Sequence, residues 1–273
     1  MAIYNSGNRP ADGYDTHTHL NDDTFWHDVP AYEARAHEFR IVEMNIVGYD
    51  AESNERAIQL AREFKDMHAI IGWQPEDISE INDERLAVYR QQLQDDNVIG
   101  VGETGLDYYW DDNPSAANQK QAFRQQLALA HEFKLPVTVH TRSAMNDTYN
   151  LLKEAHVEEF GGVMHSFTGT PAEAKQFLDL GMYISFSGIA TFKNAKDVQE
   201  TVKSIPLDRL LVETDAPYLA PTPMRGKPNE PMYVHYIIAH IAELLGKTYN
   251  EIAEITTENA RRLWHLDQQT NED

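Results

Sequence analysis

Eight short apolar runs, rich in β-branched residues, alternate along this chain with longer segments of helical spacing. The runs lie at 14–16, 40–47, 69–72, 98–102, 137–140, 162–165, 183–185 and 210–213, and 236–245 and 252–263 are predicted as closing helices. Strands that alternate with helices form a parallel sheet. Eight such units in 273 residues predict an α/β fold, a closed (β/α)8 TIM barrel rather than an open doubly wound sheet.

The pattern continues without a linker or a low-complexity stretch, so we expect residues 1–273 to form a single barrel domain. A hydrophobic fraction of 41% suffices for a large core. Residues 1–7 show neither the basic nor the apolar region of a secretory signal, and no later stretch is long and apolar enough to span a bilayer. These features predict a cytoplasmic protein.

The chain contains no cysteine, which excludes disulfides and thiolate metal sites. Any metal must be held by His, Asp and Glu, a donor set that suits Mg²⁺, Mn²⁺ or Zn²⁺. The formal net charge of −21 argues against a non-specific nucleic-acid binder, which normally has a basic face. It does not exclude an enzyme that meets phosphate through bound ions, because distant exposed charges are screened.

His17 and His19 stand two residues apart at the first predicted strand. Residues with this spacing on a strand point to the same face, and imidazole is the commonest protein ligand of metals. A polar turn that happens to contain histidines is the alternative for an isolated pair. The placement of further polar residues favours half of a metal site.

Four more candidates stand where later predicted strands end, and in a barrel these ends converge on the face that carries active sites. They are Glu103, His140, His165 and Asp215. Taken singly, His140 could simply terminate a strand, and His165 could be a half-buried histidine bonded to backbone. Asp215 could cap a turn, and Glu103 could be an exposed loop acid. Their joint occurrence at strand ends favours a metal site.

Four imidazoles and two carboxylates are too many for one tetrahedral ion and match two ions. A carboxylate such as Glu103 can bridge the two ions, whereas an imidazole cannot. Two ions about 3.5–4 Å apart clamp the attacking and leaving oxygens of a displacement and deliver a hydroxide at neutral pH, so the expected chemistry is hydrolysis. The remaining histidines lack this placement and are interpreted as surface or packing residues. They are His27, His37, His68, His131, His156, His235, His240 and His265.

Four segments that follow one another along the chain have the character of ordered motifs: Asp15–His19, Gly102–Tyr108, His165–Gly169 and Glu213–Leu219. They resemble the motifs of the TatD family of metal-dependent hydrolases, amidohydrolase-like TIM barrels whose characterised members are divalent-metal DNases, often 3′→5′ exonucleases. The similarity runs from about Tyr14 to Leu263 and so covers nearly the whole chain.

The resemblance implies that His17 and His19 bind one ion together with Asp215. Asp215 is also the expected general base toward the metal-bound water, and its pKa should remain low beside the ions. Glu213 stands two residues earlier. It either orients a metal-ligating histidine by a hydrogen bond or makes a purely structural hydrogen bond.

The resemblance further implies that Glu103 bridges the ions and that His140 and His165 hold the second one. One departure from the family concerns the segment after the third predicted strand. The family commonly has Gly-x-His-Pro there, whereas this chain has Gln74 in the place of the histidine. Glutamine neither titrates nor readily binds a metal, so a changed substrate or reduced nuclease activity is expected to follow from Gln74.

Three cations are candidates for binding substrate phosphate, with ordinary solvated surface as their alternative. Arg225 and Lys227 match the family's basic loop after the last strand, and Arg142 follows the strand of His140. Four aromatic residues near the same strands could stack on bases or pack against the barrel. They are Tyr108, Tyr109, Trp110 and Tyr218.

The combined prediction is a two-ion phosphodiester hydrolase that acts on DNA, single-stranded or at an end, by means of a metal-bound hydroxide. No membrane and no obligate protein partner are implied. One alternative is a hydrolase of an amide, ester or lactone in a small molecule on the same scaffold. A second alternative is a non-catalytic, metal-bound binding protein, against which the intact set of six ligands argues.

Overall fold

The computed structural model describes residues 10–266. Residues 1–7, on which part of the cytoplasmic prediction rests, lie outside this range. The described residues divide into two compact units. Unit 1 comprises 10–44, 166–174 and 184–266, and unit 2 comprises 45–165 and 175–183. The prediction that residues 1–273 form a single domain stays a prediction.

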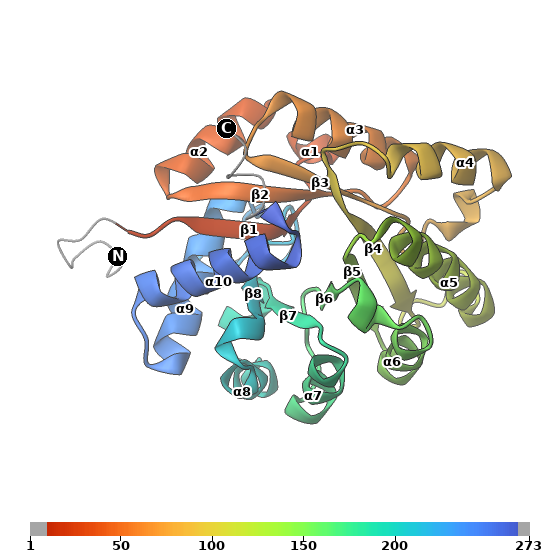
Figure 1. Cartoon of the computed structure of the whole chain (residues 1–273). Helices are drawn as coiled ribbons and strands as arrows, with labels where there is room; N and C mark the ends of the chain where they lie inside the picture. The colour runs from red at the N-terminus through yellow and green to blue at the C-terminus, as the bar shows by residue number, and fades with distance from the viewer. Residues whose placement is uncertain (1–9, 267–273) are drawn as a thin grey trace. The chain divides into compact units, whose positions relative to one another are not determined.

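Eight strands follow one another in the sheet in sequence order, with helices between them (Figure 1). They are β1 (Gly13–Thr18), β2 (Ile41–Val47), β3 (Met67–Ile71), β4 (Val98–Asp107), β5 (Val137–Arg142), β6 (Gly162–Met164), β7 (Tyr183–Phe186) and β8 (Leu210–Val212). β3 to β6 pair in parallel, as do β7 and β8. This order confirms the predicted (β/α)8 TIM-barrel class.

Helices connect the strands. They are α1 (Asp23–Trp26), α2 (Val29–Glu38), α3 (Ala51–Glu63), α4 (Asp83–Gln92), α5 (Ala116–Phe133), α6 (Met145–Glu154), α7 (Pro171–Asp179), α8 (Lys196–Ser204), α9 (Val234–Leu245) and α10 (Tyr249–Leu263). The two predicted closing helices at 236–245 and 252–263 lie within α9 and α10. Short 3₁₀ turns are η1 (Ile78–Glu80), η2 (Val157–Glu159), η3 (Gly188–Thr191), η4 (Leu207–Arg209) and η5 (Pro231–Tyr233). Within the described range, none of the helices has the length and apolarity to cross a membrane.

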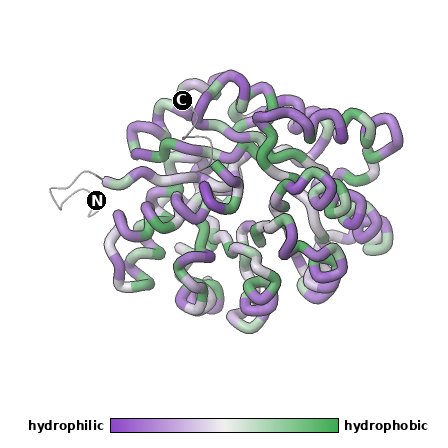
Figure 2. Tube along the Cα trace, viewed as in Figure 1, coloured by the Kyte–Doolittle hydropathy of each residue, from purple (hydrophilic) through white to green (hydrophobic). Residues whose placement is uncertain are grey.

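Local sequence explains where α10 starts and where α9 stops. The Thr248 hydroxyl accepts a hydrogen bond from the Glu251 N–H, and the Glu251 carboxylate accepts one from the Thr248 N–H, which forms a capping box at the start of α10. Gly246 ends α9 in a left-handed conformation that costs glycine little. Apolar residues of α9, Ile237, Ile238 and Ile241, are fully buried in unit 1. Figure 2 shows the mixture of hydrophobic and hydrophilic residues along such helices.

β4 is longer than predicted, and this changes the setting of Glu103. The sequence predicts a strand at 98–102, but all ten residues from Val98 to Asp107 are buried strand. The β4–β5 register shifts between Val101 and Thr104, which lets the strand continue past Gly102. At Gly105 the backbone has φ 141° and approaches the His140 carbonyl so closely that a Cβ would lie 2.0 Å from its oxygen. Glu103 is therefore a buried strand residue, and its alternative as an exposed loop acid is wrong.

Candidate metal centre

In unit 1, backbone hydrogen bonds bring His17, His19 and Asp215 together. Asp215 N donates to the His17 carbonyl at 2.9 Å, and His19 N donates to the Ala216 carbonyl at 2.8 Å. These bonds extend the pairing of β1 with the segment that follows β8. As the two-residue spacing predicts, the imidazoles of His17 and His19 lie on the same side, with ring centroids 4.9 Å apart.

The donor atoms of these three side chains form a small triangle. The Nε2 atoms of His17 and His19 are 3.2 Å apart, and Asp215 Oδ1 lies 3.7 Å from the first and 3.4 Å from the second. Both histidines are at most 5% exposed at the side chain, whereas Asp215 is 14% exposed. One face of the carboxylate therefore reaches solvent while the imidazoles do not.

A buried carboxylate that the sequence analysis did not single out fixes this arrangement. Asp15 Oδ1 accepts hydrogen bonds from Thr214 N at 2.8 Å and from His17 N at 3.4 Å, and its Oδ2 lies 2.5 Å from the Thr214 hydroxyl. Burial raises the pKa of Asp15 to about 8, against the lowering effect of these bonds. Asp15 thus ties the residue before Asp215 to the strand that carries the two histidines.

Unit 2 holds a second triangle, formed by Glu103 on β4, His140 on β5 and His165 just after β6. Glu103 Oε1 lies 3.1 Å from His140 Nδ1 and 3.2 Å from His165 Nε2, and the two nitrogens are 3.3 Å apart. The strands set this geometry, because His140 pairs with Gly105 in the β4–β5 register and His165 N donates to the Val139 carbonyl. The buried His165 therefore hydrogen-bonds to the sheet through its backbone N–H, while its imidazole ring lies in the triangle.

Asp107, at the end of β4, orients His140. Its Oδ2 lies 3.0 Å from His140 Nε2, the ring nitrogen that faces away from Glu103. Burial alone would lower the pKa of His140, but the bonds to Asp107 and Glu103 raise it to about 9. Burial would raise the pKa of Asp107, and its bonds with His140 and with the Tyr109 N–H instead hold it below its usual range. The surroundings of His140 therefore favour positive charge.

The spacing within each triangle fits a bound cation. Metal–donor bonds of about 2.0–2.2 Å place adjacent donors about 3.3–3.6 Å apart at tetrahedral angles and about 2.8–3.1 Å apart at right angles. The six distances within the two triangles span 3.1–3.7 Å, and the longest, between His17 Nε2 and Asp215 Oδ1, slightly exceeds these ranges. Hydrogen bonds account for individual sides, whereas one shared cation would account for the convergence of all three donors. Imidazole with carboxylate is also the donor set of zinc and manganese sites.

Glu213 and Gln74 are close in sequence to strands that carry candidate metal ligands or neighbour them, but Glu213 is buried and Gln74 is half-buried. Glu213 follows β8 directly, is 1% exposed, and donates its N–H to the Phe186 carbonyl at 3.2 Å. Gln74 follows β3 and is half-buried, with its side-chain amide donating to Asp77 Oδ2 at 2.6 Å. Gln74 therefore has a fixed orientation in unit 2.

The three candidate phosphate-binding cations are all exposed. The Arg225 guanidinium lies 3.9 Å from the centre of the Phe192 ring. Lys227 belongs to the same loop, where its N–H donates to the Met224 carbonyl. Arg142, at the end of β5, lies over the aromatic loop that follows β4. Their role as substrate-binding residues stays a prediction.

Two of the other histidines illustrate packing and surface roles. His235 is 2% exposed and stacks on Phe39 with a centroid distance of 4.6 Å, and burial lowers its pKa to about 4. His131 is exposed and pairs with Glu159 at 2.8 Å.

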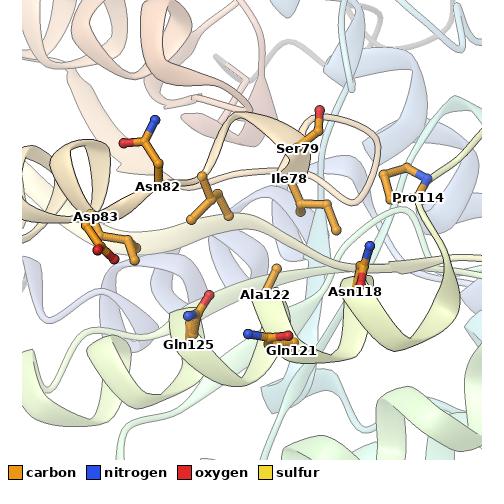
Figure 3. A pocket seen from close by; sticks show the side chains of 11 residues that line it. Ile78, Ser79, Asn82, Asp83, Pro114, Asn118, Gln121, Ala122 and Gln125 are labelled. Carbon is orange, nitrogen blue, oxygen red and sulfur yellow. The ribbon is translucent and has the colours of Figure 1, made fainter.

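A separate cleft of about 290 Å³ lies in unit 2, between the start of α4 and the first turns of α5 (Figure 3). Its lining is rich in side-chain amides, including Asn82, Asn118, Gln121 and Gln125. The Asn82 side chain accepts a hydrogen bond from Arg85 N, so it also serves as the helix cap of α4. Neither triangle contributes a side chain to this lining.

The fold and the ligand chemistry define the class of protein as a metal-dependent hydrolase of the TIM-barrel type, and comparisons with known proteins agree. The family described as TatD related DNase matches residues 14–265. The chain belongs to this family and is a metal-dependent hydrolase. A relative from Bacillus subtilis, described as the uncharacterized metal-dependent hydrolase YabD, is 44% identical over 93% of this chain and 99% of its own length.

A second relative, from Erwinia tasmaniensis, is described as the 3′-5′ ssDNA/RNA exonuclease TatD. It is 35% identical over 93% of this chain and 100% of its own length. Among solved structures, the TatD homolog YJJV from Escherichia coli K12 superposes with a TM-score of 0.88 at 30% identity. The match covers 93% of this chain and 98% of that chain, which supports the TIM-barrel fold throughout.

Proposed function

We propose that this protein is a divalent-metal-dependent phosphodiester hydrolase that removes nucleotides from the 3′ end of DNA. The observation that carries the proposal is the pair of donor triangles, each with the spacing of a cation site. The family description as a DNase and the exonuclease name of the Erwinia relative support DNA as substrate. A cytoplasmic location remains part of this proposal.

In the proposed site, the two triangles hold two ions at the carboxyl ends of the barrel strands, where TIM barrels build their active sites. His17, His19 and Asp215 would hold the first ion, and His140 and His165 would hold the second. Glu103 would be the bridging carboxylate, as the resemblance to the family implies. Bound divalent ions supply Lewis acidity and activate water at neutral pH.

The protein's own groups then have distinct tasks. Asp215 accepts a proton from the attacking water, a task that suits the partly exposed carboxylate of the first triangle. Asp107 keeps the Nδ1 lone pair of His140 directed at the ion by occupying Nε2. Glu213 supports the ligand segment after β8 from its buried position.

Three exposed cations and the half-buried Gln74 are proposed to bind the substrate. Arg142, Arg225 and Lys227 contact phosphate groups of the strand, and Gln74 contacts the substrate near the site. Gln74 supplies hydrogen bonds only, since an amide does not titrate. No obligate protein partner is required.

The test is hydrolysis of single-stranded DNA labelled at either end, with Mg²⁺ or Mn²⁺ titrated into metal-free protein. We expect stepwise loss of nucleotides from the 3′ end. His17→Ala and Asp215→Ala should lower the rate by about 100-fold or more. His131→Ala serves as the matched control, because this histidine is exposed and pairs with Glu159.

Other outcomes would overturn the proposal. Intact DNA together with turnover of a p-nitrophenyl ester or a lactone would show that the same scaffold hydrolyses a different bond. Bound metal without turnover of any of these substrates would identify a binding protein.

A further inference from the structure

Exposed aromatic side chains concentrate next to the strands that carry the proposed ligands. Within the described range, the large hydrophobic residues that remain exposed are Val88, Tyr109, Trp110 and Tyr218. Tyr109 and Trp110 follow β4 and are each 52% exposed, and Tyr218 follows β8 at 59%. Large aromatic rings left in water forgo burial energy, so a local group of them indicates a binding surface.

Tyr109 and Trp110 form an ordered group with Arg142. Their rings meet edge to face, with centroids 4.7 Å apart and planes at 88°. The Arg142 guanidinium lies 3.7 Å from the centre of the Tyr109 ring and 5.3 Å from that of Trp110. The cation thus lies against aromatic faces rather than extending into solvent, which holds all three side chains in one group.

The backbone beneath this group is held in place by Gln119 on α5. The Gln119 side chain accepts from Asp107 N at 2.8 Å and donates to the carbonyls of Asp107 and Pro114, both at 2.8 Å. Asn113 Nδ2 donates to the same Asp107 carbonyl at 3.2 Å. A surface fixed in this way loses little conformational freedom on binding a ligand.

One carboxylate joins the aromatic group to the second triangle. Asp107 Oδ1 accepts a hydrogen bond from Tyr109 N at 2.9 Å, while Oδ2 lies 3.0 Å from His140 Nε2. A ligand that lies on Tyr109 and Trp110 is therefore next to the residues that hold the second ion. Arg142 places one positive charge at this surface, in a loop where the exposed Asp111 and Asp112 follow Trp110.

We propose that Tyr109, Trp110 and Arg142 form a stacking platform for an unpaired nucleobase of the substrate strand, an inference that rests on the proposed nuclease function. Every base has a π-face, so such a platform accepts all four bases, and Arg142 adds attraction to the strand's phosphate. A base inside a duplex is stacked between its neighbours and does not present its face. The platform therefore makes a single-stranded end the preferred substrate.

The direct test measures binding of a short phosphorothioate oligothymidylate, which resists hydrolysis, to the metal-loaded protein by fluorescence anisotropy. Trp110→Ala and Tyr109→Ala should each raise Kd by between about 5-fold and about 150-fold, which corresponds to the ~1–3 kcal/mol of one base–aromatic stack. Trp110→Phe should restore most of the affinity. Val88→Ala removes an exposed apolar side chain on α4 and should leave Kd unchanged.

An oligonucleotide of abasic residues separates stacking from other effects. It should bind the parent protein weakly, and Trp110→Ala should weaken it no further, because the interaction that the mutation removes requires a base. Equal losses for the abasic and the normal strand would overturn the platform, as would a Kd that Trp110→Ala leaves unchanged.

The metal centre is monitored separately by isothermal titration calorimetry with Mn²⁺. The platform variants should bind Mn²⁺ with the parent affinity, and a parallel loss would indicate damage to the metal centre and overturn the assignment. If the parent protein cleaves no DNA, the proposed nuclease function fails. The binding measurements then still decide whether these residues stack a base.

Discussion

Replacing Asp107 with asparagine changes one atom in a 2% exposed side chain and should disturb the second ion specifically. Asparagine keeps an oxygen to accept the Tyr109 N–H, and this leaves its NH₂ group facing His140 Nε2. Two donors cannot face each other, so the proton of His140 moves to Nδ1. Nδ1 is the atom that lies 3.1 Å from Glu103 Oε1, and a protonated Nδ1 cannot bind a metal.

The expected magnitude follows from the bond that is lost. A hydrogen bond to a charged group contributes about 1.5–3 kcal/mol, which corresponds to about 10-fold to 150-fold in affinity. Carboxylates that orient metal-bound histidines typically have effects of about 10-fold to 100-fold. We therefore expect Asp107→Asn to weaken binding of the second ion by about 10-fold to 100-fold, with the first ion almost unaffected.

Isothermal titration calorimetry with Mn²⁺ or Zn²⁺ on metal-free protein measures the two affinities, and hydrolysis of bis(p-nitrophenyl) phosphate reports activity across the same titration. Glu154→Gln is the control, because it removes one negative charge from an exposed pair with Arg124 in the same unit. An Asp107→Asn protein whose metal affinities both lie within about 2-fold of the parent would refute the reasoning about the tautomer.

Three further results are expected. Gln74→His should raise kcat on single-stranded DNA by at least about 10-fold without changing metal affinity, since it supplies a titratable group; an unchanged or lower kcat would contradict this. Tyr89→Phe should lower the free energy of unfolding by about 1–3 kcal/mol in urea titrations, because the buried Ile71 carbonyl loses its 2.8 Å partner; a loss well below this range would show that the carbonyl finds another donor. His235, whose pKa burial lowers to about 4, binds a proton more readily in the unfolded state, so its own contribution to the unfolding free energy should fall by about 2 kcal/mol between pH 8 and pH 5. The difference between the parent and His235→Gln in the same titrations measures this contribution, and an equal pH dependence of the two proteins would contradict it.

The alternation of apolar runs and helical segments predicts the strand order because each strand of this barrel follows the last in sequence. The length of β4 could not be predicted in the same way. Glycine is needed inside this strand because a Cβ at Gly105 would collide with the His140 carbonyl and a Cβ at Gly102 would collide with Thr138, and neither neighbour is visible in the local sequence. Local propensity and tertiary packing favour different structures here, and packing prevails.

The candidate metal ligands could be predicted from the sequence because each stands at or near the end of an apolar run. The roles of Asp107 and Asp15 could not be predicted, although both residues lie in motifs that the family resemblance rests on. A carboxylate that orients a histidine is defined by the partner it meets in space, and His140 is 33 residues from Asp107. Asp15 and Thr214 are likewise 199 positions apart in the sequence. Such partners become visible only once the strands are paired.

The acidic composition constrains how the proposed nuclease activity would meet its substrate. At physiological salt, charges more than about 8 Å away are screened, so the net charge of −21 neither attracts nor strongly repels a strand held at one point. In the proposed site, two divalent ions would outweigh the carboxylates of Glu103 and Asp215 and would make the local field at the reacting phosphate positive. Binding energy would then be concentrated at one phosphate and at the base on Tyr109 and Trp110. With only Arg142, Arg225 and Lys227 proposed to contact the strand, sliding along internal DNA would contribute little, and this arrangement would favour a free single-stranded end over the middle of a duplex.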